Sequence, residues 1–224
     1  YSINNEKYQL NRHGFAREME FELIEKTDDS ATFSLVSTIE TKKVYPFDFE
    51  LQISYSLDGS KLNIDYKVIN MGDLIMPFAI GAHPAFALIG NFEEYSLEFQ
   101  QDEVLKYHLL EEGLISNQTN ELQLDKKQLG LNYKQFEKDA LVFKTLKSKS
   151  ITILNNTNPI LKVNFNDFPN LGIWTVVNAP FLCIEPWFGY SDTTEEYDDF
   201  SKKEVIQLLK KRDTFESNYS IEIL

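Results

Sequence analysis

Hydrophobic and polar residues alternate with a period of two along much of the chain, which is the pattern of a β-strand with one buried face. Residues 47–57 show this alternation, and residues 62–68 repeat it after a short polar break. Asp58-Gly59 lies at the break, and glycine accepts the positive φ of a tight turn, so the segment predicts a β-hairpin. Comparable runs predict further strands over residues 19–24, 32–39, 95–99, 141–146, 151–154, 161–165, 172–177 and 220–224.

Many short strands joined by polar turns are typical of an all-β protein, either an antiparallel sandwich or a barrel. Two segments predict helices instead: residues 126–135, and residues 201–211 with Ser201 as N-cap and Glu204 at the third position. No linker rich in Pro, Gly or Ser divides the chain, and no repeat is visible. We therefore expect residues 1–224 to form a single domain.

The charge and the cysteine content limit the partners and the compartment. The chain has 22 basic and 35 acidic side chains, a formal charge of −13 at pH 7. This excess of carboxylates repels phosphate groups, which argues against nucleic acid and against an anionic membrane surface as partners. The single cysteine, Cys183, excludes an internal disulfide and suits a reducing compartment, so we expect a cytoplasmic protein. Because the chain begins at Tyr1, we also expect that an amino-terminal segment is missing.

Two histidines lie beside small residues that would let another group approach. His83 follows Gly81-Ala82 and precedes Pro84, which favours an extended backbone at the histidine. His13 precedes a glycine and lies between two arginines, Arg12 and Arg17. The alternative interpretations are a structural histidine bonded to a backbone carbonyl for His83 and a solvated surface turn for His13.

The segment from Pro180 to Tyr190 is the most informative one, because a carboxylate, Glu185, ends a nearly apolar strand. Desolvation raises the pKa of such a carboxyl group and makes the ionised form a stronger base. A structural ion pair is the alternative, since a buried charge needs a partner. Trp187 offers a flat apolar face against which the C–H groups of a sugar can pack.

Several function classes lack support in the sequence. No Cys/His cluster has the spacing of metal ligands, no glycine-rich loop precedes a helix, and no Gly-x-Ser-x-Gly occurs. The sequence therefore predicts no metal, no nucleotide cofactor and no serine-hydrolase site.

Four segments occur together in one order: His13-Gly14-Phe15-Ala16-Arg17, Gly81-Ala82-His83-Pro84-Ala85-Phe86, Asp139-Ala140-Leu141-Val142-Phe143 and Cys183-Ile184-Glu185-Pro186-Trp187. As a set they resemble the aldose 1-epimerase (galactose mutarotase) superfamily, in particular its LacX-like branch. The resemblance implies a large antiparallel β-sandwich that acts on the anomeric centre of a free sugar without a cofactor. It also implies an additional amino-terminal segment containing an arginine that contacts the substrate.

The resemblance assigns roles to individual residues. Glu185 matches the catalytic base and His83 the catalytic acid, and His13 matches a second active-site histidine that bonds near the ring oxygen. Asp139 matches the acidic residue that holds sugar hydroxyls, and Arg17 belongs to a loop that lines the site.

Three other functions stay open at this point. A non-catalytic carbohydrate-binding module would use the same sandwich and Trp187 without bringing His83 and Glu185 together. A glycoside hydrolase would need two facing carboxylates in place of a Glu/His pair. Arg12 and Arg17 could favour a sugar phosphate as the substrate of an epimerase. The sequence specifies neither the preferred sugar nor the oligomeric state.

Overall fold

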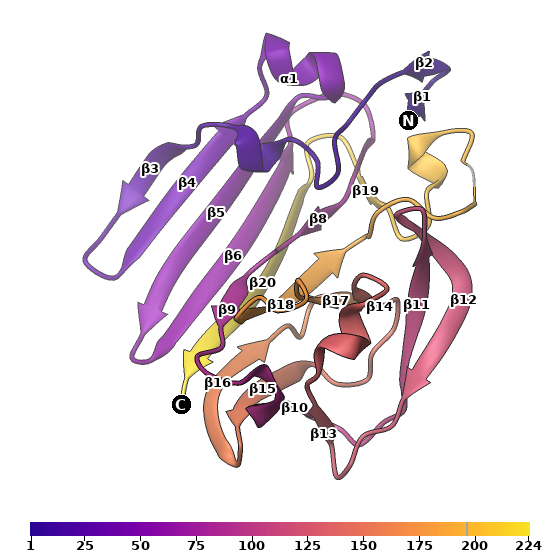
Figure 1. Ribbon diagram of the computed structural model, residues 1–224. Helices are drawn as coiled ribbons and strands as arrows, with labels where there is room; N and C mark the ends of the chain where they lie inside the picture. Colours follow the sequence, from indigo (N-terminus) through magenta and orange to yellow (C-terminus); the bar gives the residue numbers. More distant parts are fainter. Residues whose placement is uncertain (196) are drawn as a thin grey trace. The chain divides into compact units, whose positions relative to one another are not determined.

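The computed structural model describes residues 1–195 and 197–224, and most of its regular secondary structure is β-strand (Figure 1). The chain divides into two compact units, Tyr1–Ala79 with Glu196–Asn218 (unit 1), and Ile80–Glu195 with Tyr219–Leu224 (unit 2). Within each unit the paired strands run antiparallel. The prediction of an all-β, antiparallel fold is therefore confirmed, while the single-domain organisation stays a prediction.

A four-stranded meander forms the largest sheet region of unit 1, in the order β6-β5-β4-β3. Its strands are β3 (Glu22–Lys26), β4 (Ser30–Val36), β5 (Phe49–Asp58) and β6 (Lys61–Asn70). The predicted hairpin is confirmed, because Asp58 pairs with Lys61 and leaves a two-residue loop. Gly59 has a φ of 58° at the first loop position, a conformation that glycine adopts without a steric penalty.

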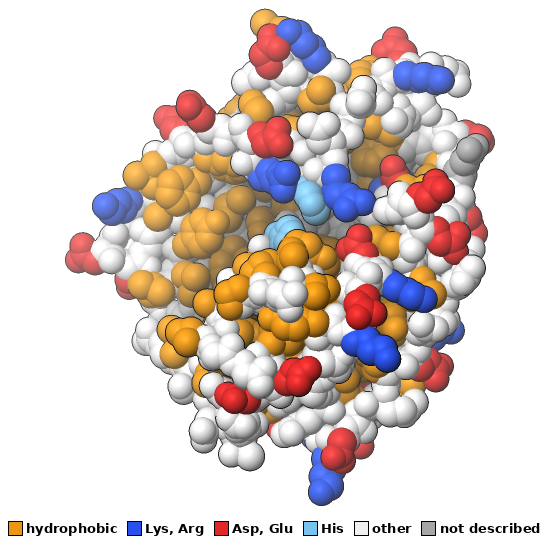
Figure 2. All heavy atoms as spheres, viewed as in Figure 1, with side chains coloured by type: hydrophobic (Ala, Val, Ile, Leu, Met, Phe, Trp, Pro, Cys, Tyr) orange, Lys and Arg blue, Asp and Glu red, His pale blue; other side chains and the backbone are white. Residues whose placement is uncertain are grey.

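One face of this meander carries the apolar half of the alternating pattern. Leu35 and Leu51 pair there and are buried, and Ile64 on β6 is almost completely covered. Toward the hairpin ends the same face opens, with Tyr55 and Leu57 exposed to solvent. Figure 2 shows hydrophobic side chains gathered over this meander.

The remaining elements of unit 1 are short. They comprise β1 (Ser2–Ile3) paired with β2 (Glu6–Lys7), the 3₁₀ helices η1 (Ala16–Glu18) and η4 (Phe200–Lys202), α1 (Ile39–Val44), and β7 (Met76–Phe78) paired with β19 (Gln207–Leu209). The helix α1 overlaps a predicted strand end, and a capping box at Thr38 explains its start. β20 (Thr214–Ile223) begins in this unit.

Both predicted helices are wrong, for a backbone reason. Residues 201–211 form the end of η4 and then β19, and Val205 between them has a φ of 55°, which no right-handed helix accommodates. Asp199, not Ser201, caps η4. Residues 126–135 contain Lys126 and Lys127 at φ values of 49° and 74°, followed by strand β13 (Gln128–Gly130) and the start of a 3₁₀ helix.

Unit 2 contains two antiparallel sheets. The first has the order β13-β10-β15-β16-β20, and the second has the order β12-β11-β14-β17-β18-β8, with β9 also paired to β18. The strands are β8 (Ile80–Gly81), β9 (Ala85–Ala87), β10 (Tyr95–Phe99), β11 (Leu105–Glu111), β12 (Leu114–Leu122), β13 (Gln128–Gly130), β14 (Leu141–Phe143), β15 (Ser150–Asn155), β16 (Asn158–Asn164), β17 (Asn170–Trp174) and β18 (Phe181–Phe188). The 3₁₀ helices η2 (Phe92–Glu94) and η3 (Tyr133–Phe136) lie in its connections.

Aromatic side chains join the two sheets of unit 2 into one core. Phe168 lies between them, with its ring centroid 4.9 Å from that of Phe188 on β18 and 6.0 Å from that of Tyr219 on β20. Phe99 and Phe143, one from each sheet, are fully buried. Burying side chains of this size contributes roughly 2–3 kcal/mol each, so this core holds β18 in a fixed position.

Among the described residues, no helix is both long and apolar enough to cross a membrane.

Candidate active site

The proposed catalytic carboxylate lies on a strand that is covered on both faces. Alternation along β18 places Cys183, Glu185 and Trp187 on one face of the strand. Leu182 and Ile184 point to the other face, where both side chains are fully buried. β17 flanks β18 on one side, and the short strands β8 and β9 flank it on the other. Glu185 is therefore held by a central strand and not by a loop.

The strand register brings His83 opposite Glu185. Trp187 pairs with Gly81 on β8, and Cys183 pairs with Ala85 on β9, so the register continues without a slip across the gap between the two short strands. His83 falls in the middle of this gap, at the position that opposes Glu185. Backbone bonds from Ala82 N–H to the Pro186 carbonyl (2.9 Å) and from Ile184 N–H to the Pro84 carbonyl (3.4 Å) fasten the gap to β18.

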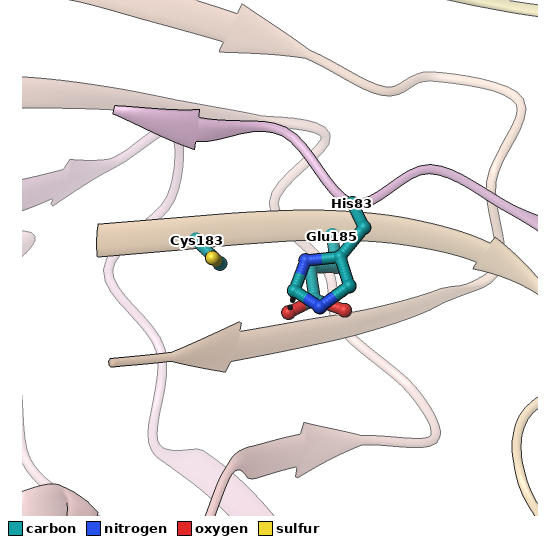
Figure 3. A group of neighbouring side chains, drawn as sticks. All are labelled: His83, Cys183 and Glu185. Atoms are coloured by element: carbon teal, nitrogen blue, oxygen red, sulfur yellow. Dashed lines mark ion pairs between the residues drawn. The ribbon is translucent and has the colours of Figure 1, made fainter. Parts of the chain in front are cut away.

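The two side chains make direct contact, as Figure 3 shows. The Nδ1 atom of His83 lies 3.2 Å from Oε1 of Glu185. The side chain of His83 is 40% exposed, whereas that of Glu185 is 7% exposed. A buried carboxylate thus meets an imidazole that reaches solvent, which is the arrangement expected of a base and an acid at the floor of a substrate site.

The surroundings of Glu185 make it a stronger base than an ordinary carboxylate. Its pKa is raised from 4.5 to about 7, and burial is the largest cause. A hydrogen bond from the Trp187 side chain acts in the opposite direction and lowers the pKa, whereas the negative charge of Asp139 raises it. Desolvation is the largest of these causes, as it is for catalytic carboxyl groups in general.

Asp139 lies where its charge acts on Glu185, just before β14 in the same sheet as β18. Its backbone has a φ of 80°, and its carboxylate accepts a 2.8 Å hydrogen bond from the Ala140 N–H. The structure therefore brings four predicted residues together in unit 2: His83, Glu185, Asp139 and Trp187. The contact of Asp139 with sugar hydroxyls stays a prediction.

Two glycines make room for the Trp187 indole ring. A Cβ atom on Gly81 or on Gly172 would lie 2.4 Å from indole carbons, so the ring lies against both backbones. The ring also packs against a cluster formed by Ile115, Val142 and Tyr190. Trp187 is half-buried, and its contacts indicate that it positions Glu185; direct packing against the sugar stays a prediction.

Two neighbours of the pair were missed by reasoning from the sequence. Trp174 on β17 pairs with Cys183, and its ring lies edge-on to that of His83 with centroids 6.1 Å apart. Cys183 on β18 is buried, and its sulfur shares one cluster with His83 and Glu185. Burial and then the charge of Glu185 raise the pKa of this thiol to about 12, so it is protonated and a poor nucleophile at neutral pH.

His13 and Arg17 belong to unit 1 and lie on one loop. Phe15 anchors this loop, its ring lying 5.8 Å from that of Tyr45 and 5.7 Å from that of Phe49. His13 has a φ of 71° and is exposed, and Arg17 on η1 is exposed and lies 3.9 Å from the Glu18 carboxylate. That His13 and Arg17 approach Glu185 stays a prediction.

Comparison with known proteins identifies the family. A sequence model described as aldose 1-epimerase matches residues 1–205. The chain belongs to the aldose 1-epimerase family. Members of this family are sugar isomerases, and the chain is an aldose 1-epimerase-like isomerase with a galactose mutarotase-like fold.

The chain lies in the LacX-like branch of the family. It is 37% identical over 225 aligned positions to the plasmid-encoded protein LacX of Lactococcus lactis subsp. lactis, an alignment that covers 96% of the chain and 75% of the relative. The chromosomal LacX of the same organism gives the same identity and coverage. The resemblance inferred from the four sequence segments is therefore confirmed.

Solved structures share the fold over the whole chain. A galactose mutarotase related enzyme from Lactobacillus acidophilus aligns with a TM-score of 0.94 at 29% identity, covering 100% of this chain and 77% of the other. A galactose mutarotase-like protein from Lactobacillus casei aligns with a TM-score of 0.92 at 24% identity, covering 100% and 80%. A galactose 1-epimerase from Lactobacillus acidophilus shares the fold at 14% identity with a TM-score of 0.69, covering 100% and 75%.

The hydrogen bond from Trp187 to Glu185 gives a test of the positioning role. Because this bond lowers the pKa of Glu185, Trp187→Phe is expected to move the acidic limb of the kcat/KM pH profile to higher pH. Trp174→Phe is the matched control, since Trp174 contacts the imidazole and does not contribute to the pKa of Glu185. A Trp187→Phe enzyme with reduced activity but an unchanged profile would assign the tryptophan to packing alone.

Proposed function

We propose that the protein interconverts the α and β anomers of a free hexose by general acid–base ring opening. The observation that carries the proposal is the contact between His83 and the buried Glu185, at 3.2 Å. Membership of the aldose 1-epimerase family supports the reaction class, and the name of the galactose 1-epimerase neighbour makes galactose the first sugar to assay.

The reaction needs one base and one acid at the same carbon. Glu185 takes the proton of the C1 hydroxyl while His83 protonates the ring oxygen, so the bond between C1 and the ring oxygen breaks and an open-chain aldehyde forms. Rotation about the C1–C2 bond turns the other face of the carbonyl toward the ring-closing hydroxyl. Closure then reverses both proton transfers, and no atom is gained or lost.

The pKa of Glu185 suits a reaction that runs in both directions. At about 7 it lies close to neutral pH, so Glu185 can take up and release a proton with little cost under these conditions. After ring opening the carboxyl group is protonated and the imidazole is neutral. Closure on either face restores the starting protonation states without help from the solvent.

The other predicted residues act as binding groups in this proposal. Asp139 accepts hydrogen bonds from sugar hydroxyls, His13 bonds near the ring oxygen, and Arg17 borders the site. The carboxylates of Glu185 and Asp139 favour an uncharged sugar over a sugar phosphate, because two negative charges act on the same site in unit 2. The lone cysteine leads us to propose the reducing cytoplasm as the compartment.

Anomer equilibration measured by polarimetry tests the proposal. Freshly dissolved α-galactose and α-glucose are expected to reach rotational equilibrium faster with enzyme than in buffer, and the corresponding 6-phosphates, followed by NMR, more slowly than the free sugars. Sugar binding without faster equilibration would favour the carbohydrate-binding alternative. Release of the aglycone from an aryl glycoside would favour the hydrolase alternative, which needs a second carboxylate at the bond.

A further inference from the structure

Three side chains that could each bind a metal ion lie close together where His83 contacts Glu185. One ligand atom each from His83, Cys183 and Glu185 lies within 4.8 Å of both others. Figure 3 shows Cys183 and Glu185 projecting from the same strand, with the His83 imidazole beside the carboxylate. Two residues of β18 and the opposing residue of the neighbouring segment supply the cluster, so the backbone pairing described above fixes their spacing.

The distances between the ligand atoms are close to those around a metal ion with tetrahedral coordination. Metal–nitrogen and metal–oxygen distances of about 2.0–2.2 Å place two such ligands about 3.3–3.6 Å apart in a tetrahedral site. His83 Nδ1 and Glu185 Oε1 already lie 3.2 Å apart. A thiolate at about 2.3 Å from the ion would lie about 3.6 Å from each of them, so a side-chain adjustment of about 1 Å brings Cys183 into position.

The kind of ligand selects the kind of ion. A set of one sulfur, one imidazole nitrogen and one carboxylate oxygen suits zinc, whereas magnesium and calcium prefer oxygen ligands alone. The three ligands leave a fourth position of the ion for water, and the exposed side of His83 provides the route from solvent. The charges of Glu185 and Asp139 add attraction for a cation.

We propose that His83, Cys183 and Glu185 form an inhibitory site for a divalent zinc-type cation. Binding forms one bond from the metal to each side chain; the thiol proton of Cys183 and the proton shared between Nδ1 of His83 and Oε1 of Glu185 pass to solvent as these atoms become ligands. The bound ion occupies the lone pairs of Glu185 and His83 that accept and deliver protons in the proposed reaction. The enzyme is therefore inactive while the ion is bound. The proposal of metal binding depends only on the positions of the three ligand atoms, whereas the proposal of inhibition rests on the proposed function.

Cobalt substitution tests metal binding without an activity assay. One equivalent of Co²⁺ added to the metal-free protein is expected to give the visible bands of a tetrahedral ion and a near-ultraviolet band from the thiolate, both abolished by Zn²⁺. Cys183→Ser, with Cys183→Ala as a second variant because the site is buried, is expected to lose the near-ultraviolet band and to bind metal at least about ten-fold more weakly. His108→Asn is the control, since His108 bonds the Ser116 carbonyl and lies outside the cluster.

Polarimetry with added Zn²⁺ completes the experiment. Zinc is expected to inhibit the wild-type enzyme, and the Cys183 variants are expected to need at least about ten-fold more zinc for the same inhibition. Absence of the thiolate band in folded wild-type protein overturns the metal site. A normal band together with full mutarotase activity in saturating zinc overturns the catalytic role of His83 and Glu185 and leaves the metal site standing.

Discussion

Glu185→Gln is expected to lower the turnover of anomer equilibration at least about 100-fold, which is the lower end of a general-base contribution. Glutamine keeps the size of the side chain and can still hydrogen-bond to His83, but its amide cannot accept the proton of the C1 hydroxyl. Sugar binding should persist, because the change removes no volume from the site. Turnover by polarimetry and affinity by calorimetry, measured on the same preparation, separate these two effects.

The same variant is expected to be more stable than the wild type above neutral pH. The pKa of Glu185 is raised from 4.5 to about 7 in the folded protein, so between these values the folded state binds more protons than the unfolded state. Protonation of Glu185 therefore stabilises the folded state relative to its ionised form; this contribution is fully present below about pH 4.5 and is lost as the pH rises through 7. The ionised carboxylate therefore costs the wild type on the order of 3 kcal/mol above that window, and glutamine avoids this cost.

Thermal unfolding between pH 5 and 8 measures this difference, with Glu121→Gln as the control, because Glu121 is an exposed residue of strand β12. If Glu185 anchored a structural ion pair instead, the glutamine variant would be less stable by a few kcal/mol at every pH above the ordinary pKa of the carboxyl group. A stable Glu185→Gln variant with near-normal mutarotation would remove Glu185 as the base.

The local parts of the site could be predicted from the sequence, whereas the pairing between distant segments could not. Alternation in β18 and the apolar residues around Glu185 predict a buried carboxylate on a strand, and burial is the main cause of its raised pKa. The opposition of His83 to Glu185 depends on a register between segments about 100 residues apart, which no local pattern encodes. The same register places Cys183 in the cluster, and no short metal-ligand spacing in the sequence joins it to the distant His83.

The errors in the predicted elements have a related cause. Residues 201–211 have the composition of a helix, but Gln207, Leu208 and Leu209 pair with β7, and the positive φ at Val205 lets the chain turn into that strand. Long-range strand pairing thus overrides a local helical pattern. The hairpin at Gly59 was predicted well because its turn and both of its strands lie within one continuous segment.

His83→Asn is expected to lower turnover by a factor similar to that of Glu185→Gln, at least about 100-fold. Asparagine keeps a hydrogen-bonding group near the carboxylate but cannot deliver a proton to the ring oxygen at neutral pH. His108→Asn is the matched control, because His108 lies on β11 with its imidazole bonded to the Ser116 carbonyl. That control should retain wild-type turnover and separate loss of the acid from a general effect of losing an imidazole.

The double variant Glu185→Gln with His83→Asn decides whether the two groups act as one unit. If each proton transfer requires the other, removing the second group from an enzyme that already lacks the first should lower turnover little further. Independent contributions would multiply instead, to at least about 10,000-fold, since each general acid–base contribution is worth about 100-fold or more. Because Nδ1 and Oε1 lie 3.2 Å apart, we expect strong non-additivity. Multiplicative losses in folded protein would show that the groups assist separate steps, and concerted ring opening by this pair would be wrong.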